Sequence, residues 1–461
     1  MLFNSPLFIL LFLPLALAGY WALARQTTAR LWFLSAASVA FYGYWNWLDV
    51  PLLLVSVIAN WGLSTVFGRL PATAIQRRRL LVLTAVCGNL AVLGAYKYLL
   101  FFASTLTTLT GWPETAPSAW SLPLGISFFT FHHIIYWMDL KRGLAPVYPL
   151  RDYALYITSF PQILAGPLVR NREIVPQFAL SPCRPGWQQR CMQGVTLFVI
   201  GLGKKVFLAD ALAALSNPLY AQAGKAALAT TEAWTAVLAF SLQIYFDFSG
   251  YSDMAIGLAL MLGMVLPLNF DAPYRATSLQ DFWRRWHMTL SRFLRDYLYI
   301  AFGGSHHGLW RQCAALIATM ALGGLWHGAG WTFVLWGLAH GVALAAGALW
   351  RRWLPAVPAL LGWPLTMLFV ALSWVLFRAP DLTTASHILG SLWPTTALTP
   401  PPGGGRTLLL AALVAIIGPT SWQVVSRLRP RPLWAVIMAV VLVLALLKMR
   451  DGAYEFIYFQ F

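Results

Sequence analysis

Long apolar stretches, each bounded by short polar segments, recur along most of the chain. A stretch of about 20 apolar residues is long enough to cross a bilayer as a helix. The first stretch has no Lys or Arg ahead of it, and Arg25 follows it, so it predicts a membrane span rather than a signal peptide. A second span is expected between Arg30 and the aromatic segment at 44–49. Further spans are expected at 51–68, 80–103, 122–139, 312–325, 330–350, 357–377, 408–425 and 432–449.

The middle of the chain is less regular, and four segments there depart from the simple pattern. Segment 152–170 is interrupted by prolines, which indicates a re-entrant or interfacial segment. Segment 276–301 carries too much charge to face lipid, so it predicts an amphipathic or re-entrant helical pair covered by protein. The other two are 192–218, a helix interrupted by Lys204-Lys205, and 233–266, a long helix that contains carboxylates.

These elements together predict an all-α polytopic membrane protein with roughly 11 to 13 transmembrane helices plus re-entrant or interfacial helices. Composition supports this class, because only 10% of the residues are charged, against about 25% in soluble domains. The net charge of +17 could suggest nucleic acid. The basic residues, however, are scattered over short loops, as is typical of cytoplasmic loops. Membrane lipids, and no nucleic acid, are therefore the expected surroundings.

The segment DFWRRWHMTL at 281–290, with the residues that follow it, concentrates charge in an apolar chain. Arginines at this density are costly in hydrocarbon. They could extend toward lipid head groups from an interfacial helix, or they could clamp a phosphate-rich ligand. The same segment contains a titratable imidazole at His287. The arginines concerned are Arg284, Arg285, Arg292 and Arg295.

A second histidine, His327, lies within GGLWHGAGW at 323–331. The small residues around it would let another backbone or a ligand approach closely. A histidine inside a membrane suggests a functional site, although a core histidine bonded to a backbone carbonyl is the alternative. No structural disulfide or metal site is expected, since the four cysteines show no metal-binding spacing. The remaining histidines considered, His132-His133, His306-His307 and His340, are interpreted as structural.

Two carboxylates, Asp247 and Asp253, stand in the apolar stretch YFDFSGYSDMAIG at 245–257. They could form a proton path, as in a transporter. They could instead cap a broken helix or pair with the arginines of 281–296, which is the interpretation we favour.

Five segments resemble the membrane-bound O-acyltransferase family, over residues from about 120 to 345, and most closely its bacterial alginate O-acetyltransferase branch. They are FFTF followed by Asp (128–139), SFPQILAGPLVR (159–170), DFSGYSDMAIGLALMLG (247–263), 268–304 and GLWHGAGWTFVLWGLAHG (324–341). The resemblance implies a helical bundle around a central tunnel, with a catalytic core at 120–350. Residues 1–119 would then be N-terminal transmembrane helices, and 351–461 C-terminal transmembrane helices with an aromatic tail.

The resemblance also implies an activity. The enzyme would transfer acetyl groups from cytoplasmic acetyl-CoA across the bacterial inner membrane to an exported, alginate-like polysaccharide, with a periplasmic SGNH-type acetyltransferase as partner. His327 would deprotonate the attacking hydroxyl, and His287 would orient the thioester or stabilise the oxyanion. Arg284, Arg285, Arg292 and Arg295 would hold the coenzyme phosphates. Acetyl-CoA would be the acyl donor, and no permanently bound cofactor is expected.

The chain ends in the aromatic segment FIYFQF at 456–461. An interfacial anchor is one interpretation. The segment also resembles a tyrosine-bearing motif of related D-alanyl transfer systems, which implies that Tyr458 carries the acetyl group as a phenyl ester.

Other functions stay open at this point. The acceptor could be peptidoglycan, cellulose or a teichoic acid. A transporter could relay ions through His327, Asp247 and Asp253, although no repeated halves are evident. A non-catalytic scaffold for a polysaccharide synthase is the third class.

Overall fold

The computed structural model describes residues 1–111, 122–164, 166–393, 403–428, 431–449 and 456–457. Its secondary structure is helical throughout that part of the chain, which confirms the predicted all-α class. The α-helices of the first half are α1 (Leu13–Ala22), α2 (Thr27–Gly43), α3 (Val50–Arg69), α4 (Ile75–Leu93), α5 (Leu99–Thr110), α6 (Ile126–Lys141), α7 (Leu150–Thr158), α8 (Asn171–Phe178), α9 (Trp187–Gly203), α10 (Asp210–Ala223) and α11 (Thr230–Met261). Those of the second half are α12 (Leu279–Arg285), α13 (Met288–Phe293), α14 (Leu309–His327), α15 (Trp331–Trp353), α16 (Ala359–Arg378), α17 (Leu382–Ser391), α18 (Gly405–Ile416), α19 (Ser421–Arg427) and α20 (Pro432–Met449).

Five helices in the described residues are long and apolar enough to cross a membrane. A sixth candidate is the α18–α19 pair, which bends by 59° between its two helices. The chain is thus a multi-pass membrane protein. The other helices are too short or too polar to meet this criterion. The number of helices that meet it is therefore lower than the predicted count of roughly 11 to 13 spans. The five single spans are Trp47–Arg69, Ile75–Thr110, Trp331–Trp353, Ala359–Arg378 and Pro432–Met449.

The irregular middle segments have specific local causes. The segment around Lys204-Lys205 is a π-helix (Lys204–Ala209) between α9 and α10, so the predicted interruption lies where the two lysines stand. Insertions of this kind are frequent at functional sites. The predicted re-entrant segment contains the short, largely buried helix α7, which ends at Thr158 and is followed by turns.

The chain forms two compact units that are interleaved in sequence. Unit 1 consists of Met1–Phe198 with Met254–Pro267, and unit 2 consists of Val199–Asp253 with Leu268–Phe461. The core of unit 1 is rich in buried tyrosine and phenylalanine and also buries Arg30. The guanidinium of Arg30 donates hydrogen bonds to the backbone oxygens of Ala24, Phe178 and Leu180, which offset the cost of burying its charge.

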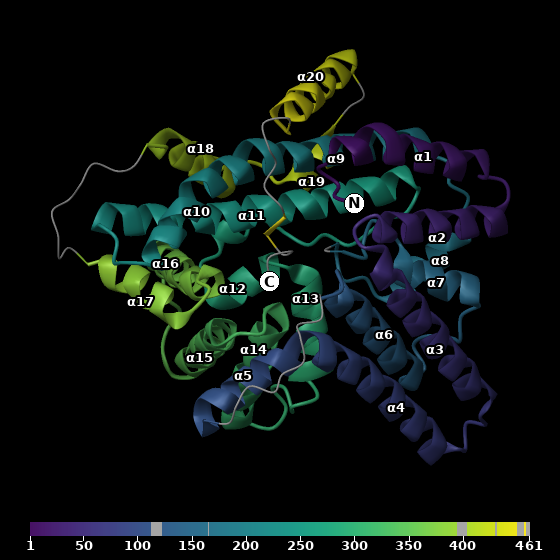
Figure 1. Cartoon of the computed structure of the whole chain (residues 1–461), viewed down its shortest axis with the longest axis horizontal. Helices are drawn as coiled ribbons and strands as arrows, with labels where there is room; N and C mark the ends of the chain where they lie inside the picture. The colour runs from purple at the N-terminus through teal and green to yellow at the C-terminus, as the bar shows by residue number, and fades with distance from the viewer. Residues whose placement is uncertain (112–121, 165, 394–402, 429–430, 450–455, 458–461) are drawn as a thin grey trace. The chain divides into compact units, whose positions relative to one another are not determined.

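In unit 2, helices α14 and α15 lie side by side (Figure 1) and approach each other through glycines. A Cβ atom added at Gly324 would overlap the Phe333 carbonyl oxygen, and one added at Gly337 would overlap the Met320 carbonyl oxygen. The glycines near His327 therefore serve a close helix–helix contact. That contact fixes the end of α14, where His327 is the last residue.

Replacing Gly337 with Ala is expected to lower the free energy of unfolding by roughly 1–3 kcal/mol, because the obstructing atom is backbone and cannot move aside. Gly347→Ala, on the same helix, is the matched control: its added Cβ would lie 3.5 Å from an Arg351 guanidinium nitrogen, an ordinary contact. Thermal unfolding in detergent measures both. Equal melting temperatures for the two variants would contradict the close-contact interpretation.

Candidate active site

The helical pair expected at 276–301 is broken at His287. Helix α12 ends at Arg285, Trp286 is extended, and α13 begins at Met288. His287 itself has φ 42° and ψ 52°, a left-handed conformation that is uncommon for a residue other than glycine. Such conformations cluster at functional sites. The break separates Arg284 and Arg285, which lie on α12, from Arg292, which lies on α13.

Asn269 holds the His287 ring and defines its protonation. Its Oδ1 accepts a hydrogen bond from the Thr289 backbone N–H at 3.3 Å, and a backbone N–H can only donate, so this atom is the oxygen. The same Oδ1 lies 3.0 Å from Nδ1 of His287. Nδ1 must therefore carry the proton and donate it, which leaves the lone pair of the neutral ring on Nε2.

Nε2 of His287 has no hydrogen-bond partner in the part of the chain that the structure describes, although the residue is fully buried. An unpaired buried polar atom is costly and calls for an explanation. Burial lowers the pKa of the His287 imidazole, since the charged form is penalised away from water. Nε2 is thus a buried proton acceptor that remains neutral at physiological pH.

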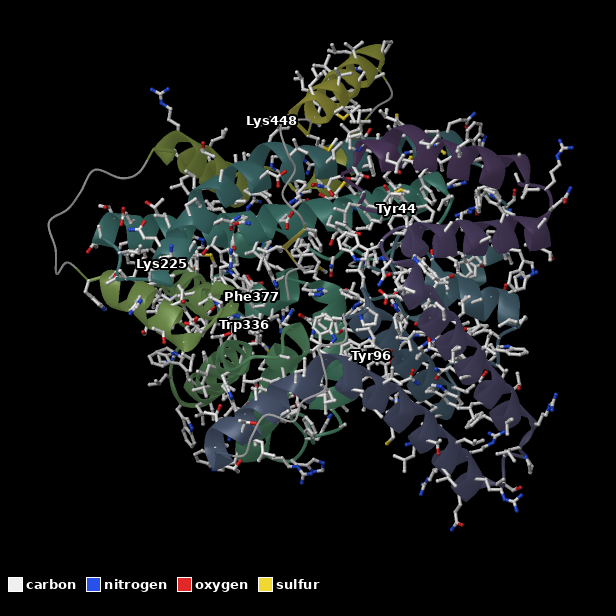
Figure 2. The ribbon with its side chains drawn as sticks, in the orientation of Figure 1. Tyr44, Tyr96, Lys225, Trp336, Phe377 and Lys448 are labelled. Atoms are coloured by element: carbon white, nitrogen blue, oxygen red, sulfur yellow. The ribbon has the colours of Figure 1, made fainter. Side chains whose placement is uncertain are left out.

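His327 lies at the C-terminus of α14, 6% exposed, among three aromatic rings. Its ring centroid is 4.8 Å from that of Trp326, 5.3 Å from Trp336 and 5.2 Å from Phe377. Trp336 and Phe377 lie next to each other in Figure 2. The Trp326 ring also lies 6.4 Å from the His287 ring. Both predicted histidines therefore lie near the ring of one tryptophan, Trp326.

Two of the histidines interpreted as structural, His340 and His133, are held by hydrogen bonds, whereas both ring nitrogens of the buried His132 lack a hydrogen-bond partner among the described residues. Nδ1 of His340 accepts from the Trp283 indole at 3.2 Å, and its Nε2 lies 2.9 Å from the Ser373 hydroxyl, so both ring nitrogens are satisfied. His133 contacts the Tyr153 hydroxyl at 2.6 Å, and His132 packs edge-on against a tyrosine ring. His306 and His307 are exposed. No group of metal-ligating side chains occurs in the described ranges.

A pocket of about 400 Å³ lies beside the α12–α13 break and is rich in arginine. Three of the four predicted arginines line it: Arg284, Arg292 and Arg295. Arg285 does not line this pocket; its guanidinium pairs with Asp281 at 2.9 Å instead. Met288, the residue after His287, lines the pocket as well, so the basic surface reaches the immediate neighbour of the buried imidazole.

Two residues of this site were not predicted from the sequence. Arg351, at the end of α15, is a fourth guanidinium on the pocket wall; its place beside Arg352 suggested only a basic loop. Asn269 lies within segment 268–304, which carries part of the family resemblance, but it was not singled out. The role of neither residue could be read from the sequence, because each depends on contacts between segments that are separated along the chain.

Asp247 and Asp253 of α11 pair with lysines and contact no arginine among the described residues. Of the two structural alternatives that we favoured, helix capping or pairing with arginines, the arginine pairing is therefore wrong. Asp247 lies 2.9 Å from Nζ of Lys205, which also contacts Asp210 at 2.8 Å. Asp253 pairs with Lys204 at 2.7 Å. The lysines of the π-helix therefore neutralise the carboxylates of the neighbouring helix, which argues against a free carboxylate relay.

The beginning of the C-terminal aromatic segment is buried against the same helix. Phe456 and Ile457 are 1% and 2% exposed. The Phe456 ring stacks on Tyr251 at 4.4 Å, and it lies 6.0 Å from Phe248, whose ring is 4.7 Å from His287. Tyr458, the predicted acetyl carrier, lies outside the described residues.

Residues 115–384 match the MBOAT, membrane-bound O-acyltransferase family. A peptidoglycan O-acetyltransferase from Helicobacter pylori is 37% identical over 423 residues, which cover 84% of this chain and 79% of that protein. A probable alginate O-acetylase from Pseudomonas aeruginosa is 40% identical over 391 residues, covering 84% of this chain and 73% of that one. A teichoic acid D-alanyltransferase from Streptococcus thermophilus is 26% identical over 50% of this chain and 57% of its own length.

Proposed function

Since this chain belongs to the membrane-bound O-acyltransferase family, we propose that it moves acetyl groups from cytoplasmic acetyl-CoA across the bacterial inner membrane for O-acetylation of an exported polysaccharide. The chain is an O-acyltransferase and a multi-pass membrane protein. The proposal is supported further by one observation. A buried, unprotonated histidine nitrogen lies at the junction of two short helices, and the same two helices contribute side chains to an arginine-rich pocket.

The arginine pocket suits acetyl-CoA as the donor. Coenzyme A carries several phosphate charges, and guanidinium groups bind phosphate through paired, charge-assisted hydrogen bonds. Arg284 comes from α12 and Arg292 from α13, on either side of the break that places His287. A donor held by these side chains would bring its thioester close to the histidine pair, because the pocket wall continues to Met288.

The chemistry needs one proton acceptor and one acyl acceptor. We assign His327 as the general base that removes the proton of the attacking hydroxyl. The Nε2 lone pair of His287 suits it to accept a hydrogen bond and orient that hydroxyl, whereas stabilising an oxyanion would require a protonated ring. As the new C–O bond forms, the C–S bond breaks, and the proton leaves with the coenzyme A thiolate.

Tyr458 is the proposed first acceptor, forming a phenyl ester that remains activated for a second transfer. The burial of Phe456 and Ile457 beside Phe248 supports this role, since Phe248 contacts the His287 ring. A periplasmic SGNH-type acetyltransferase would then pass the acetyl group to the polysaccharide. The relatives differ in acceptor, alginate for one and peptidoglycan for another, at similar identity. We favour an alginate-like polymer, with peptidoglycan, cellulose or a teichoic acid as the alternatives.

Arg351→Gln is expected to raise the KM for acetyl-CoA about tenfold, the value of one charge-assisted hydrogen bond of roughly 1.5 kcal/mol. The KM for acetyl-pantetheine, which lacks the nucleotide phosphates, should not change. Arg352→Gln is the matched control, because Arg352 is an adjacent, equally exposed arginine that does not line the pocket. Thiol release by the purified protein and its partner in detergent measures both constants.

Two outcomes would contradict the assignment of this pocket as the acetyl-CoA site. An equal rise for both donors would make Arg351 a structural residue, and no rise would remove the pocket as the donor site.

Turnover in detergent without a membrane gradient separates the enzyme from a transporter, which would need two compartments. Incubation with purified alginate or peptidoglycan fragments, followed by mass spectrometry of the polymer, identifies the acceptor.

A further inference from the structure

A buried cluster on α11 holds the backbone of the C-terminal tail. The Ile457 backbone N–H donates a hydrogen bond of 2.7 Å to Oδ2 of Asp247, and this contact is buried. The two residues lie 210 positions apart in sequence. We call Lys205, Asp247 and Tyr251 the tail anchor, since the Phe456 ring stacks on Tyr251 with an interplanar angle of 22°.

The two oxygens of the Asp247 carboxylate contact different groups. Oδ1 lies 2.9 Å from Nζ of Lys205, and Oδ2 accepts the tail amide. Lys205 also contacts Asp210, so two carboxylates share one ammonium in a site where the lysine side chain is only 4% exposed. A buried carboxylate is stable only when it is paired and hydrogen-bonded. The lysine therefore holds the Asp247 carboxylate in the orientation that the tail amide needs.

The anchor lies one aromatic ring away from His287. Phe248 follows Asp247 directly; its ring is 4.7 Å from the His287 ring and 6.0 Å from the Phe456 ring. A tail residue held at Ile457 leaves only one peptide bond to Tyr458, which limits how far the phenol can travel. Holding a reactant in this way lowers the entropic cost of reaching the reactive geometry.

We propose that Asp247, oriented by Lys205, is a positioning residue that anchors the tail at Ile457 and so sets the reach of Tyr458 toward His287 and His327. This inference rests on the proposed acetyl relay through Tyr458. It also gives a role to the buried carboxylate of the YFDFSG segment, for which the chemistry of acyl transfer alone has no use.

A matched carboxylate is available on the same helix. Asp253 pairs with Lys204 at 2.7 Å and accepts a hydrogen bond of 2.6 Å from the Ser421 hydroxyl. It is thus a second lysine-paired carboxylate with one further donor, but the donor belongs to α19 instead of the tail. Asp253→Leu therefore controls for the loss of a buried ion pair in this helix.

The test uses the full-length protein in detergent and measures how fast carboxypeptidase trims the tail past Tyr458. Asp247→Leu removes the acceptor and leaves Lys205 its partner Asp210, while Ile457→Pro removes only the donor. Each is expected to speed trimming about 10- to 100-fold, as loss of one charge-assisted hydrogen bond implies. The double variant should be no faster than either single variant, and Asp253→Leu should trim at the wild-type rate.

The acetyl-transfer rate is measured on the same samples. With the relay operating, kcat should fall in Asp247→Leu and Ile457→Pro while the KM for acetyl-CoA stays constant. Unchanged trimming in Ile457→Pro, or equally fast trimming in Asp253→Leu, would overturn the anchor. If Asp247→Leu does not fold, Ile457→Pro decides alone, because it leaves the ion cluster intact. Full transfer by Tyr458→Phe would instead remove the relay, and the trimming series would still decide the anchor.

Discussion

His327→Ala is expected to lower kcat for acetyl transfer by about 10²- to 10⁴-fold, the usual contribution of a positioned general base. His287→Ala should cause a loss of the same order, because it removes the buried Nε2 acceptor that orients the hydroxyl. The measurement is release of the coenzyme A thiol, together with acetyl transfer to the partner, by purified protein in detergent. Melting temperatures recorded on the same samples show whether each variant is folded.

His340→Ala is the control for these two substitutions. His340 is also a fully buried histidine of unit 2, but both of its ring nitrogens are already hydrogen-bonded to side chains. Its loss should lower stability through two broken hydrogen bonds and leave kcat per folded molecule within a few-fold of wild type. Full turnover by His327→Ala, combined with loss of complex assembly, would favour the scaffold function instead.

Tyr458→Phe is expected to abolish covalent acetylation of the chain. After incubation with acetyl-CoA, intact-mass spectrometry should find one acetyl increment on the wild type and none on Tyr458→Phe, because phenylalanine has no oxygen to acylate. His327→Ala should also lack the increment, since the phenol, with a pKa near 10, needs a base to attack at neutral pH.

Two other results in the same mass spectra would contradict the acetyl relay through Tyr458. An increment retained by Tyr458→Phe would place the acetyl group on another residue. The absence of an increment on the wild type, with turnover only when the periplasmic partner is added, would mean direct transfer and would make the tail an anchor. Phe459→Leu is a suitable control, because it changes the adjacent aromatic residue and leaves the phenol in place.

Much of this protein could be predicted from its sequence because the signals are local. Runs of apolar residues predicted the helices at 51–68, 330–350 and 357–377, and the structure has α3, α15 and α16 there. The histidines at 287 and 327 could be singled out because a titratable group in an apolar segment is costly unless it has a use. The arginine cluster was conspicuous for the same reason.

Other features follow from contacts that local patterns do not encode. The break at His287 depends on hydrogen bonds that the segment around His287 makes to the side chain and to the backbone carbonyl of Asn269. Similarly, the division into two interleaved units could not be read from a linear order of helices. The expected alternative that Asp247 and Asp253 pair with arginines was wrong, because α11 packs beside the π-helix that presents Lys204 and Lys205.

The membrane-embedded, all-helical class and the residues able to carry acyl-transfer chemistry could thus be recognised from local patterns, since hydropathy and side-chain chemistry are properties of single residues and their neighbours. The arrangement of those residues became clear only from the folded chain. It assigned the free lone pair of His287 to Nε2, added Arg351 to the arginine pocket, and joined Ile457 to Asp247. Each of these depends on the direction of a hydrogen bond or the proximity of segments far apart in the chain, and a linear pattern specifies neither.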